Sequence, residues 1–376
     1  MSQPMMLPIG LAIHPLDLLV FRDGRPFDAG ARAESGLPTP QTFAGAVRTW
    51  LLREHGCDFE QLRKDLTAGK TFAEAASGQS SAGYQTVGRL SFRGPWFARG
   101  GAVNDRVEPL IPVPAVLQKV KGSSQQEGPE LCRLGPLRTG PPGWMPAERG
   151  MLPLWSRNPR TTEPLEGYLT LKGVEDFLRS GQAVPNPSDV VEREKVFAYT
   201  DRTGIAIEPD KLAAEEGRIY GLRYLELRGG ICLYGEVLVP ENAPNDLLPN
   251  EAVIQFGGEG RRCRVQRTKQ PARWPSAEAS GGDCVLLLLT TPGLFDDGWR
   301  PASLNGKVIS AAVPKPTAIS GWDLARGGPK PNRFAAPAGS VYFLKELPSG
   351  TCDSLCEGEY AELGWGTFLK GVWTYV

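Results

Sequence analysis

The alternation of apolar and polar residues near the N-terminus predicts a strand followed by a polar turn. Residues 11–21 are rich in β-branched and aromatic side chains, which favour strands. The apolar positions change parity at His14 and Pro15. Because proline donates no ladder hydrogen bond, we expect a β-bulge there, within a strand at the centre of a sheet. The polar turn that follows carries Arg22 and Arg25.

A helix is predicted to follow this turn. Thr39 is a suitable N-cap, and Pro40 suits the first helical position. The next apolar residues have the spacing of one buried helix face; they are Phe43, Val47, Trp50 and Leu51. The opposite face is expected to carry Gln41, Gly45 and Arg48. Because glycine has no side chain, the backbone of a protein or RNA can approach this face closely, although easier helix packing also explains a glycine.

The middle of the chain differs from its flanks because prolines are frequent over residues about 88–190. We interpret this segment as a large insertion on the surface of the first domain. After it, strands are predicted over 218–227 and 231–239 with a hairpin turn between them, and a helix over 245–255. The order strand, helix, insertion, two strands, helix and strand fits a ferredoxin-like βαββαβ domain.

A second domain is predicted to follow the first after residue 270. Its strands are expected at 284–289, 307–313, 317–324 and 341–347, with a last strand near the C-terminus. That last strand follows a glycine-rich stretch, 364–371, whose uncovered backbone N–H groups can form an anion-binding nest for a phosphate. The sequence therefore predicts an α+β protein with two ferredoxin-like (RRM-like) domains, residues 1–270 and 271–376.

Composition limits the classes of function. The 376 residues contain 42 Lys and Arg against 42 Asp and Glu, so a surface for nucleic acid has to be local. Without a signal peptide or a long apolar run, we expect a cytoplasmic protein that does not enter a membrane. The 7 cysteines are scattered and are expected to be free thiols. Cys352 and Cys356 lie close together, but four nearby ligands are lacking, so no zinc site is expected.

Two regions combine the residue types that nucleic acids contact. The first is a run of cations without an acidic residue, made up of Arg261, Arg262, Arg264, Arg267, Lys269 and Arg273. Such a run can meet several phosphates, although a solvated face is the simpler explanation. The second mixes basic residues with Trp322, and its cations are Lys315, Arg326, Lys330 and Arg333. A tryptophan among cations suits base stacking beside phosphates, while a core position for Trp322 explains it equally well.

Four stretches carry a resemblance to a known family. They are F-R-D-G-R-P-F (21–27) with P-x-P-x-T-x-x-G-A-x-R (38–48), T-D-R-T-G-I (200–205) with E-G-R-I-Y (216–220), S-G-W-D-L (320–324) with P-K-P (329–331) and P-A-G-S-V-Y (337–342), and G-W-G-T-F-L-K-G (364–371). Together they resemble the third subunit of the Cmr complex, a RAMP (repeat-associated mysterious protein) subunit of type III-B CRISPR effector complexes.

The resemblance implies an RNA-binding subunit that is not an enzyme and needs no metal or cofactor. Such a subunit binds and caps the 5′ handle of the CRISPR RNA (crRNA) in a hetero-oligomeric antiviral complex. Its expected protein partners are the large polymerase-like Cmr subunit and the repeated backbone RAMP subunit. The residues expected to bind RNA are Arg22, Arg25, Thr42, Gly45, Arg48, Arg202, Thr203, Lys315, Trp322, Lys330, Gly364, Gly366 and Thr367.

Two other functions stay open at this point. Some RAMP proteins are metal-independent endoribonucleases that process repeat RNA, a reaction that needs a general base. The 2 histidines, His14 and His55, both have simpler structural explanations, in a strand and at the end of a helix, whereas a lysine or tyrosine base is also conceivable. The other possibility is a purely structural bridging subunit whose basic clusters bind acidic protein surfaces.

Overall fold

The computed structural model describes residues 5–22, 32–78, 82–100, 107–122, 129–145, 150–208, 210, 213–275, 284–323, 327–348 and 353–376. Of residues 32–34, 82, 83, 205–208, 213–220, 322 and 323 it describes the backbone alone. Arg25 and Cys352 therefore lie outside the described residues, as does the side chain of Trp322.

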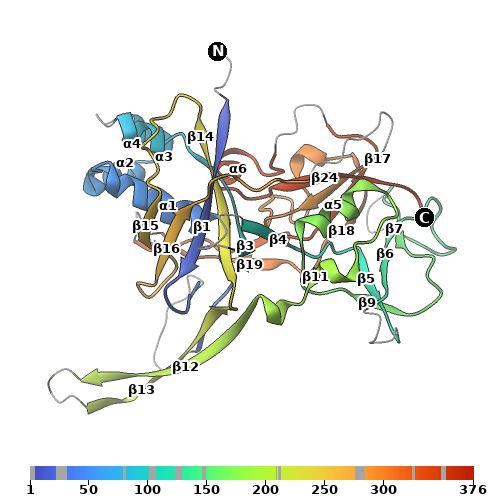
Figure 1. Ribbon diagram of the computed structural model, residues 1–376, viewed down its shortest axis with the longest axis horizontal. Coiled ribbons are helices and arrows are strands. Elements are labelled where there is room, and N and C mark those ends of the chain that lie inside the picture. Colours follow the sequence, from blue (N-terminus) through green and yellow to red (C-terminus); the bar gives the residue numbers. More distant parts are fainter. Residues whose placement is uncertain are drawn as a thin grey trace.

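The largest sheet of the described chain has eight strands, each antiparallel to its neighbours (Figure 1). In spatial order they are β11 (Val190–Val191), β10 (Tyr168–Leu169), β4 (Val107–Pro112), β3 (Ser91–Gly100), β14 (Ile231–Pro240), β1 (Met6–Pro15), β16 (Arg262–Arg267) and β15 (Glu251–Gln255). The predicted N-terminal strand thus lies inside a sheet, but it starts earlier and ends at Pro15. The register between β1 and β16 is regular through His14 and Pro15, so the bulge predicted there is wrong.

The helices pack on both faces of this sheet: α1 to α4 lie in the core on one face, and α5 lies in the core on the other. They are α1 (Pro40–Glu54), α2 (Phe59–Thr67), α3 (Phe72–Ser77), α4 (Ala82–Val87), α5 (Leu171–Arg179) and α6 (Gly358–Glu362), with 3₁₀ turns η1 (Pro187–Asp189), η2 (Arg193–Lys195) and η3 (Ala302–Leu304). In α1 the predicted stripe from Phe43 to Leu51 is buried, which confirms that face of the helix. It packs on Leu11 and Ile13 of β1 in one hydrophobic core.

A second sheet has four strands within the described residues. Their order is β18 (Val308–Ala312), β23 (Val341–Leu344), β17 (Cys284–Leu289) and β24 (Phe368–Trp373). Strand β17 alternates between two cores: Leu286 and Leu288 pack against the first sheet, whereas Leu287 and Leu289 pack on the far side around Trp365. The two sheets are therefore joined through a continuous apolar layer.

A buried polar cluster lies in that layer. The Trp96 indole N–H of the first sheet donates to the Thr290 main-chain oxygen at 3.0 Å, directly after β17. Beside it, Glu236 Oε1 accepts from the Tyr234 hydroxyl at 2.9 Å and from the Trp274 indole N–H at 2.8 Å. Burial raises the pKa of Glu236, and these two hydrogen bonds offset the shift in part. The carboxyl group thereby fixes Trp274 in the segment that connects the two sheets.

The proline-rich region is only partly an insertion. Its strands β3, β4 and β10 belong to the eight-stranded sheet, so the insertion predicted over about 88–190 is wrong for these parts. The rest forms small sheets of β6 (Leu131–Arg133), β5 (Leu117–Val120) and β9 (Thr162–Pro164), and of β7 (Gly135–Pro136) and β8 (Leu154–Trp155). Sequence reasoning missed this because prolines are compatible with strand ends and edges.

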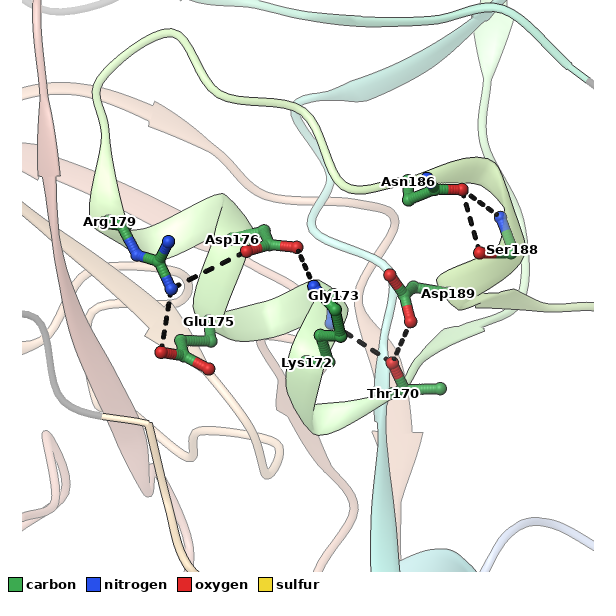
Figure 2. Close-up of polar contacts among 9 residues, drawn as sticks. All are labelled: Thr170, Lys172, Gly173, Glu175, Asp176, Arg179, Asn186, Ser188 and Asp189. Carbon is green, nitrogen blue, oxygen red and sulfur yellow. Dashed lines mark hydrogen bonds and ion pairs between the residues drawn. The ribbon is translucent and has the colours of Figure 1, made fainter.

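Helix α5 closes this region against the second sheet. Thr170 caps its start by accepting from the Gly173 N–H at 3.1 Å, and the same hydroxyl donates to Asp189 Oδ1 at 2.9 Å (Figure 2). At its other end, Arg133 donates to the main-chain oxygens of Phe177 and Ser180 at 2.9 and 2.8 Å. Burial lowers the pKa of Arg133 to about 10. A cation at the C-terminus of a helix meets orphan carbonyls and the negative end of the dipole.

A long hairpin arm extends from the body of the molecule. It consists of β12 (Phe197–Glu208) and β13 (Ala213–Leu227), with the short parallel strand β2 (Arg32–Glu34) at the side of β13 (Figure 1). The remaining strand pairs are β19 (Thr317–Ile319) with β22 (Arg333–Ala335), and β20 (Trp322–Asp323) with β21 (Gly328–Pro329).

Two predictions around this arm are wrong. The turn at Gly229 and Gly230 exists, but β13 and β14 do not pair across it, because β13 joins the arm while β14 enters the large sheet. The helix predicted over 245–255 is instead a run of turns followed by the edge strand β15. Pairing with β16, a tertiary interaction, overrides local helix preference in this segment.

Three other expectations have different outcomes. The predicted domain boundary at 270/271 falls between β16 and β17, the strands that end the first sheet and begin the second; the division itself stays a prediction. Cysteines 57, 132, 232, 263, 284 and 356 are free thiols. Among the described helices, none combines the length and the apolar character needed to cross a membrane.

Candidate nucleic-acid interface

Arg22 lies at the start of the predicted RNA surface. The preceding residue is fixed, because the Phe21 N–H donates to Ser35 Oγ at 3.0 Å. Arg22 itself forms an ion pair with Glu259, with 3.3 Å between Nη1 and Oε1. Both side chains are partly exposed, so this pair contributes little to stability and the arginine can exchange the carboxylate for a phosphate.

The partner of Arg22 is held in an unusual backbone conformation. Among the described residues, Glu259 is the one non-glycine residue with φ in the left-handed region, at +56°. It lies between Gly257 (φ +88°) and Gly260 (φ +63°) in a tight loop. Sequence reasoning missed Glu259, although the glycines around it are a signal for such a turn. The Glu259 carboxylate thus reaches Arg22 from a locally strained backbone.

Arg202 and Thr203 are exposed on β12 near the root of the hairpin arm. The guanidinium carbons of Arg202 and Arg261 lie 5.7 and 4.7 Å from the centre of the Tyr224 ring. The backbone N–H of Leu18 lowers the pKa of Asp17, and the charges of these two arginines lower it further. The root of the arm therefore combines two cations with one aromatic ring, a grouping that sequence spacing did not reveal.

The exposed face of α1 contacts the segment that follows β19. Gln41 Nε2 donates to the Ser320 main-chain oxygen at 3.3 Å. On the other side of Ser320, its hydroxyl donates to Lys330 O at 3.1 Å, and the Lys330 N–H donates to Gly321 O at 2.8 Å. The structure thus brings the first and third family-like stretches together at one place. One turn further along α1, Gly45 is exposed, and a Cβ there would have no atom within 4 Å.

Arg48 is not on this exposed face. Its exposed fraction is 8%, and its guanidinium carbon lies 4.5 and 5.2 Å from the centres of the Phe72 and Phe92 rings. Burial lowers the pKa of Arg48, while the charges of Glu359 and Glu362 on α6 oppose this shift. The expectation that Arg48 lies opposite the buried stripe is therefore wrong: its side chain lies between aromatic rings and contributes to packing.

The glycine-rich stretch near the C-terminus is a buried structural turn. Gly364 and Gly366 have φ values of +92° and +69°. A Cβ at Gly364 would lie 2.7 Å from the Phe92 main-chain oxygen, and one at Gly366 would lie 2.7 Å from Cys356 Sγ. Both positions therefore require glycine for reasons of conformation and space.

The backbone N–H groups of this stretch are not available to an anion. The donors Gly364, Trp365, Gly366 and Thr367 bond to Ala361 O, Tyr360 O, Pro292 O and Thr291 Oγ1, at 2.8 to 3.0 Å. The predicted phosphate nest is wrong, because tertiary packing uses these donors. Sequence alone shows that glycines expose N–H groups, but it does not show which acceptors the fold brings to them.

Lys315, Thr42 and His14 are the remaining candidate residues. Lys315 is exposed in the segment between β18 and β19, and Thr42 is half-buried with its hydroxyl 2.9 Å from that of Thr39. His14, the possible catalytic base, is half-buried, and its Nε2 has no hydrogen-bond partner among the described residues. Burial, and then the charge of Arg264, lower the pKa of His14. An imidazole in this setting is neutral at physiological pH.

Comparison with known proteins shows the family of this chain. The model of the CRISPR-associated protein (Cas_Cmr3) family matches residues 11–373, nearly the whole chain. The chain belongs to the Cas_Cmr3 family. It is a subunit of a type III CRISPR effector complex. No curated protein matches it.

Solved structures of such complexes contain similar chains. One is in the cryo-EM structure of the type III-B Cmr-beta bound to cognate target RNA and AMPPnP, with 18% identity, a TM-score of 0.47 and coverage of 89% of this chain and 86% of that chain. Another is in the crystal structure of the Csm1-Csm4 cassette in complex with cA4, with 13% identity, a TM-score of 0.32 and coverage of 97% and 96%. At these values the family match, and not the structural likeness, identifies the chain.

Proposed function

We propose that this chain is the handle-binding RAMP subunit of a type III-B effector complex, which binds and caps the 5′ handle of the crRNA. The contact between Gln41 and Ser320 carries the proposal. It joins the exposed, glycine-bearing face of α1 to the loop of the second domain that carries Lys330. Two family-like stretches far apart in sequence therefore form one surface, which we call the handle surface.

The chemistry of the handle surface suits an RNA strand. Arg22, Arg202 and Lys330 supply cations for phosphates, and the bare Cα of Gly45 lets a sugar-phosphate backbone come close to α1. Thr42 and Thr203 add hydroxyl groups that can hydrogen-bond to phosphate or 2′-hydroxyl oxygens. Neutral overall charge means that the binding is local and not a general attraction to polyanions.

Strand order supports two ferredoxin-like RAMP domains. Four of the eight strands of the first sheet, β1, β3, β14 and β16, are neighbours in space. Numbered one to four in chain order, they lie in the spatial order two, three, one, four. In the second sheet, β17, β18, β23 and β24 have the same order. A βαββαβ unit has this strand order. In this chain, turns or short helices replace some of the crossover helices of that unit.

As partners we propose the large polymerase-like subunit and the first copy of the repeated backbone subunit, in a hetero-oligomeric antiviral complex. The chain itself is proposed to be non-catalytic. The low pKa of half-buried His14 supports this only indirectly, because a neutral imidazole is also the form that a general base requires. Cleavage therefore has to be measured directly in the test of the proposal.

The test begins with purification of the tagged chain from its native host. RNA that co-purifies is sequenced, and proteins in the same sample are identified by mass spectrometry. We expect short RNAs that share one repeat-derived 5′ handle, together with a large polymerase-like subunit. Protein partners without such RNA would support a bridging subunit instead, and the handle-binding proposal would then be withdrawn.

A matched pair of variants tests the surface itself. Arg22→Ala removes an arginine that pairs with Glu259, and Arg179→Ala removes an exposed arginine of α5, where Arg179 pairs with Glu175 at 2.9 Å and with Asp176 at 3.8 Å. We expect only Arg22→Ala to weaken binding of a handle oligonucleotide, by a factor of about ten for one charge-assisted contact. Equal affinities for the two variants would contradict a role of Arg22 in the handle surface.

A further inference from the structure

Three strands, β1, β16 and β15, lie side by side at one edge of the eight-stranded sheet (Figure 1), and their register arranges residues in cross-strand rows. In one row His14, Arg264 and Val253 lie opposite one another. In the next row the Leu16 N–H donates to Arg262 O at 3.1 Å. Because side chains alternate along a strand, Arg262 and Arg264 face the same side of the sheet. We call these two rows the open sheet face.

The reverse side of these strands is closed. Cys263 and Val265, which alternate with the two arginines, are buried in the core that α1 covers. Arg262 and Arg264 are exposed. Alternation along the strand therefore divides the basic run between the two sides of the sheet. Arg262 and Arg264 are the part that is exposed on the open sheet face.

The second domain covers this side of the sheet only in part. Ala12 of β1, two residues before His14 and on the same face, packs in the core with Leu286 and Leu288 of β17. Beyond it the cover ends, and Leu16 and Val253 both have an exposed fraction of 55%. Apolar side chains are thus left uncovered beside the arginines of the open sheet face.

The charge of this region is positive and weakly compensated. Arg264 pairs with Glu251 at 3.4 Å, and about half of each side chain is exposed, so the pair contributes little. For Arg262 the described residues provide no ion pair. Arg267 is also exposed, but three positions along β16 from Arg264 it faces the opposite side of the sheet. At the other end, Arg261 packs on Tyr224 at the root of the hairpin arm and forms an ion pair with Asp17, so its charge is compensated.

We infer that the open sheet face is a second RNA contact, which holds the phosphate backbone of the strand beyond the handle without regard to base sequence. This rests on the proposed function, because it assumes that RNA already lies on the handle surface. Arg262 and Arg264 contact successive phosphates. Leu16 and Val253 support the apolar parts of the sugars and bases between them.

The spacing of the arginines favours a single strand over an acidic protein surface. Two residues along a β-strand are separated by about 6.7 Å, comparable to the spacing of successive phosphates in an extended single strand. Leu16 and Val253 leave apolar side chains uncovered beside the cations, which suits the alternating charged and apolar character of such a strand.

The test compares two double variants of the full-length chain that lose the same charge. Arg262→Ser with Arg264→Ser removes the proposed contacts, whereas Arg53→Ser with Arg63→Ser removes two exposed arginines of α1 and α2. Binding of a labelled oligouridine and of a handle oligonucleotide is measured by fluorescence anisotropy between about 50 and about 200 mM salt. For two single-strand contacts, we expect the slope of log K against log salt to be smaller by about 1.4 in the first variant alone.

Over this salt range the oligouridine affinity of the wild type and of the first variant both fall, and the factor by which it falls should be about seven times smaller for the variant. An unchanged slope, or an equal change in the control, would overturn the inference. If the first variant keeps the wild-type slope but fails to join the reconstituted complex, the face binds protein and the inference is wrong. The preference of the wild type for the handle over oligouridine is a separate readout, and its absence would contradict the proposed function instead.

Discussion

The side-chain amide of Gln41 donates to the main-chain oxygen of Ser320, with 3.3 Å between nitrogen and oxygen. The first residue is in the opening turns of α1, and the second follows β19 in the second domain. This single hydrogen bond joins two segments separated by 279 residues, both of which we propose to be part of the handle surface.

Gln41→Ala should loosen this junction without unfolding the chain. Loss of one partly buried hydrogen bond costs about 1 kcal/mol of unfolding free energy. We expect faster amide hydrogen exchange around Ser320 and Lys330 and weaker handle binding. The control is Gln61→Ala, which removes a side-chain amide bond to Asp65 on exposed α2. If both variants retain wild-type handle affinity, the junction does not shape the binding surface.

Gly45→Ala should stabilise the isolated chain while weakening its complex with RNA. A Cβ at this position meets no atom of the chain, and alanine is favoured over glycine inside a helix by about 1 kcal/mol. Urea denaturation should therefore show a higher midpoint, whereas the added methyl group prevents close approach of RNA and lowers handle affinity. Glu54→Ala, at the end of the same helix, controls for general effects on α1. A stabilised variant with unchanged affinity would show that nothing approaches Gly45 closely.

Gly366→Ala should destabilise the fold rather than affect RNA binding specifically. Gly56 offers a matched control, because the two glycines have φ values of +69° and +70°, but a Cβ at Gly56 meets no atom within 4 Å. Both alanine variants incur a backbone cost of about 1 kcal/mol, and only Gly366→Ala adds a clash with Cys356. Urea midpoints should thus fall clearly further for Gly366→Ala. Equal losses would mean that the chain around Cys356 adapts freely.

Glu236→Gln should change how stability depends on pH. Burial raises the pKa of Glu236, so the folded chain holds its proton more tightly than the unfolded chain does. The stabilisation from the protonated form is therefore complete below the ordinary pKa of glutamate and is lost as pH rises through the raised value. Relative to the wild type, the variant should gain stability in urea titrations as the pH rises from the ordinary pKa of glutamate towards neutrality. A constant difference across this range would contradict the shift.

His14→Ala should leave RNA binding and the activity of the effector complex intact. Its lowered pKa makes the ring neutral at physiological pH, so its removal deletes no phosphate contact and the salt dependence of binding should not change. Gel analysis of repeat RNA incubated with both proteins supplies the second readout. Cleavage by the wild type that disappears in a variant with normal binding would identify His14 as a catalytic base.

Local patterns predicted those elements whose own residues determine them. The buried stripe of α1 follows from apolar residues at helical spacing, and the proline at its start from a fixed φ. Residues 245–255 show the converse: their local preference is helical, yet the end of the segment pairs with β16 as strand β15. Strand pairing depends on a partner distant in sequence, which no local window contains.

The candidate site shows the same division. Sequence patterns correctly placed Gly45 on the exposed side of its helix, because helix periodicity fixes which side a residue faces. They placed Arg48 on the wrong side, since aromatic rings from α3 and β3 enclose it only after folding. They missed Glu259 and Tyr224, which become partners of arginines through tertiary contacts.

By itself, the sequence determined the family, the apolar faces, the free thiols and the local basic clusters on a neutral chain, because these depend on residue type and on spacing along one element. Only the tertiary structure decided that the two glycines before β24 pack inside, and that Gln41 meets Ser320. Which donors keep a free N–H, and which cations keep a free face, depends on what the fold packs against them. That is a property of contacts between distant segments, and no single stretch encodes it.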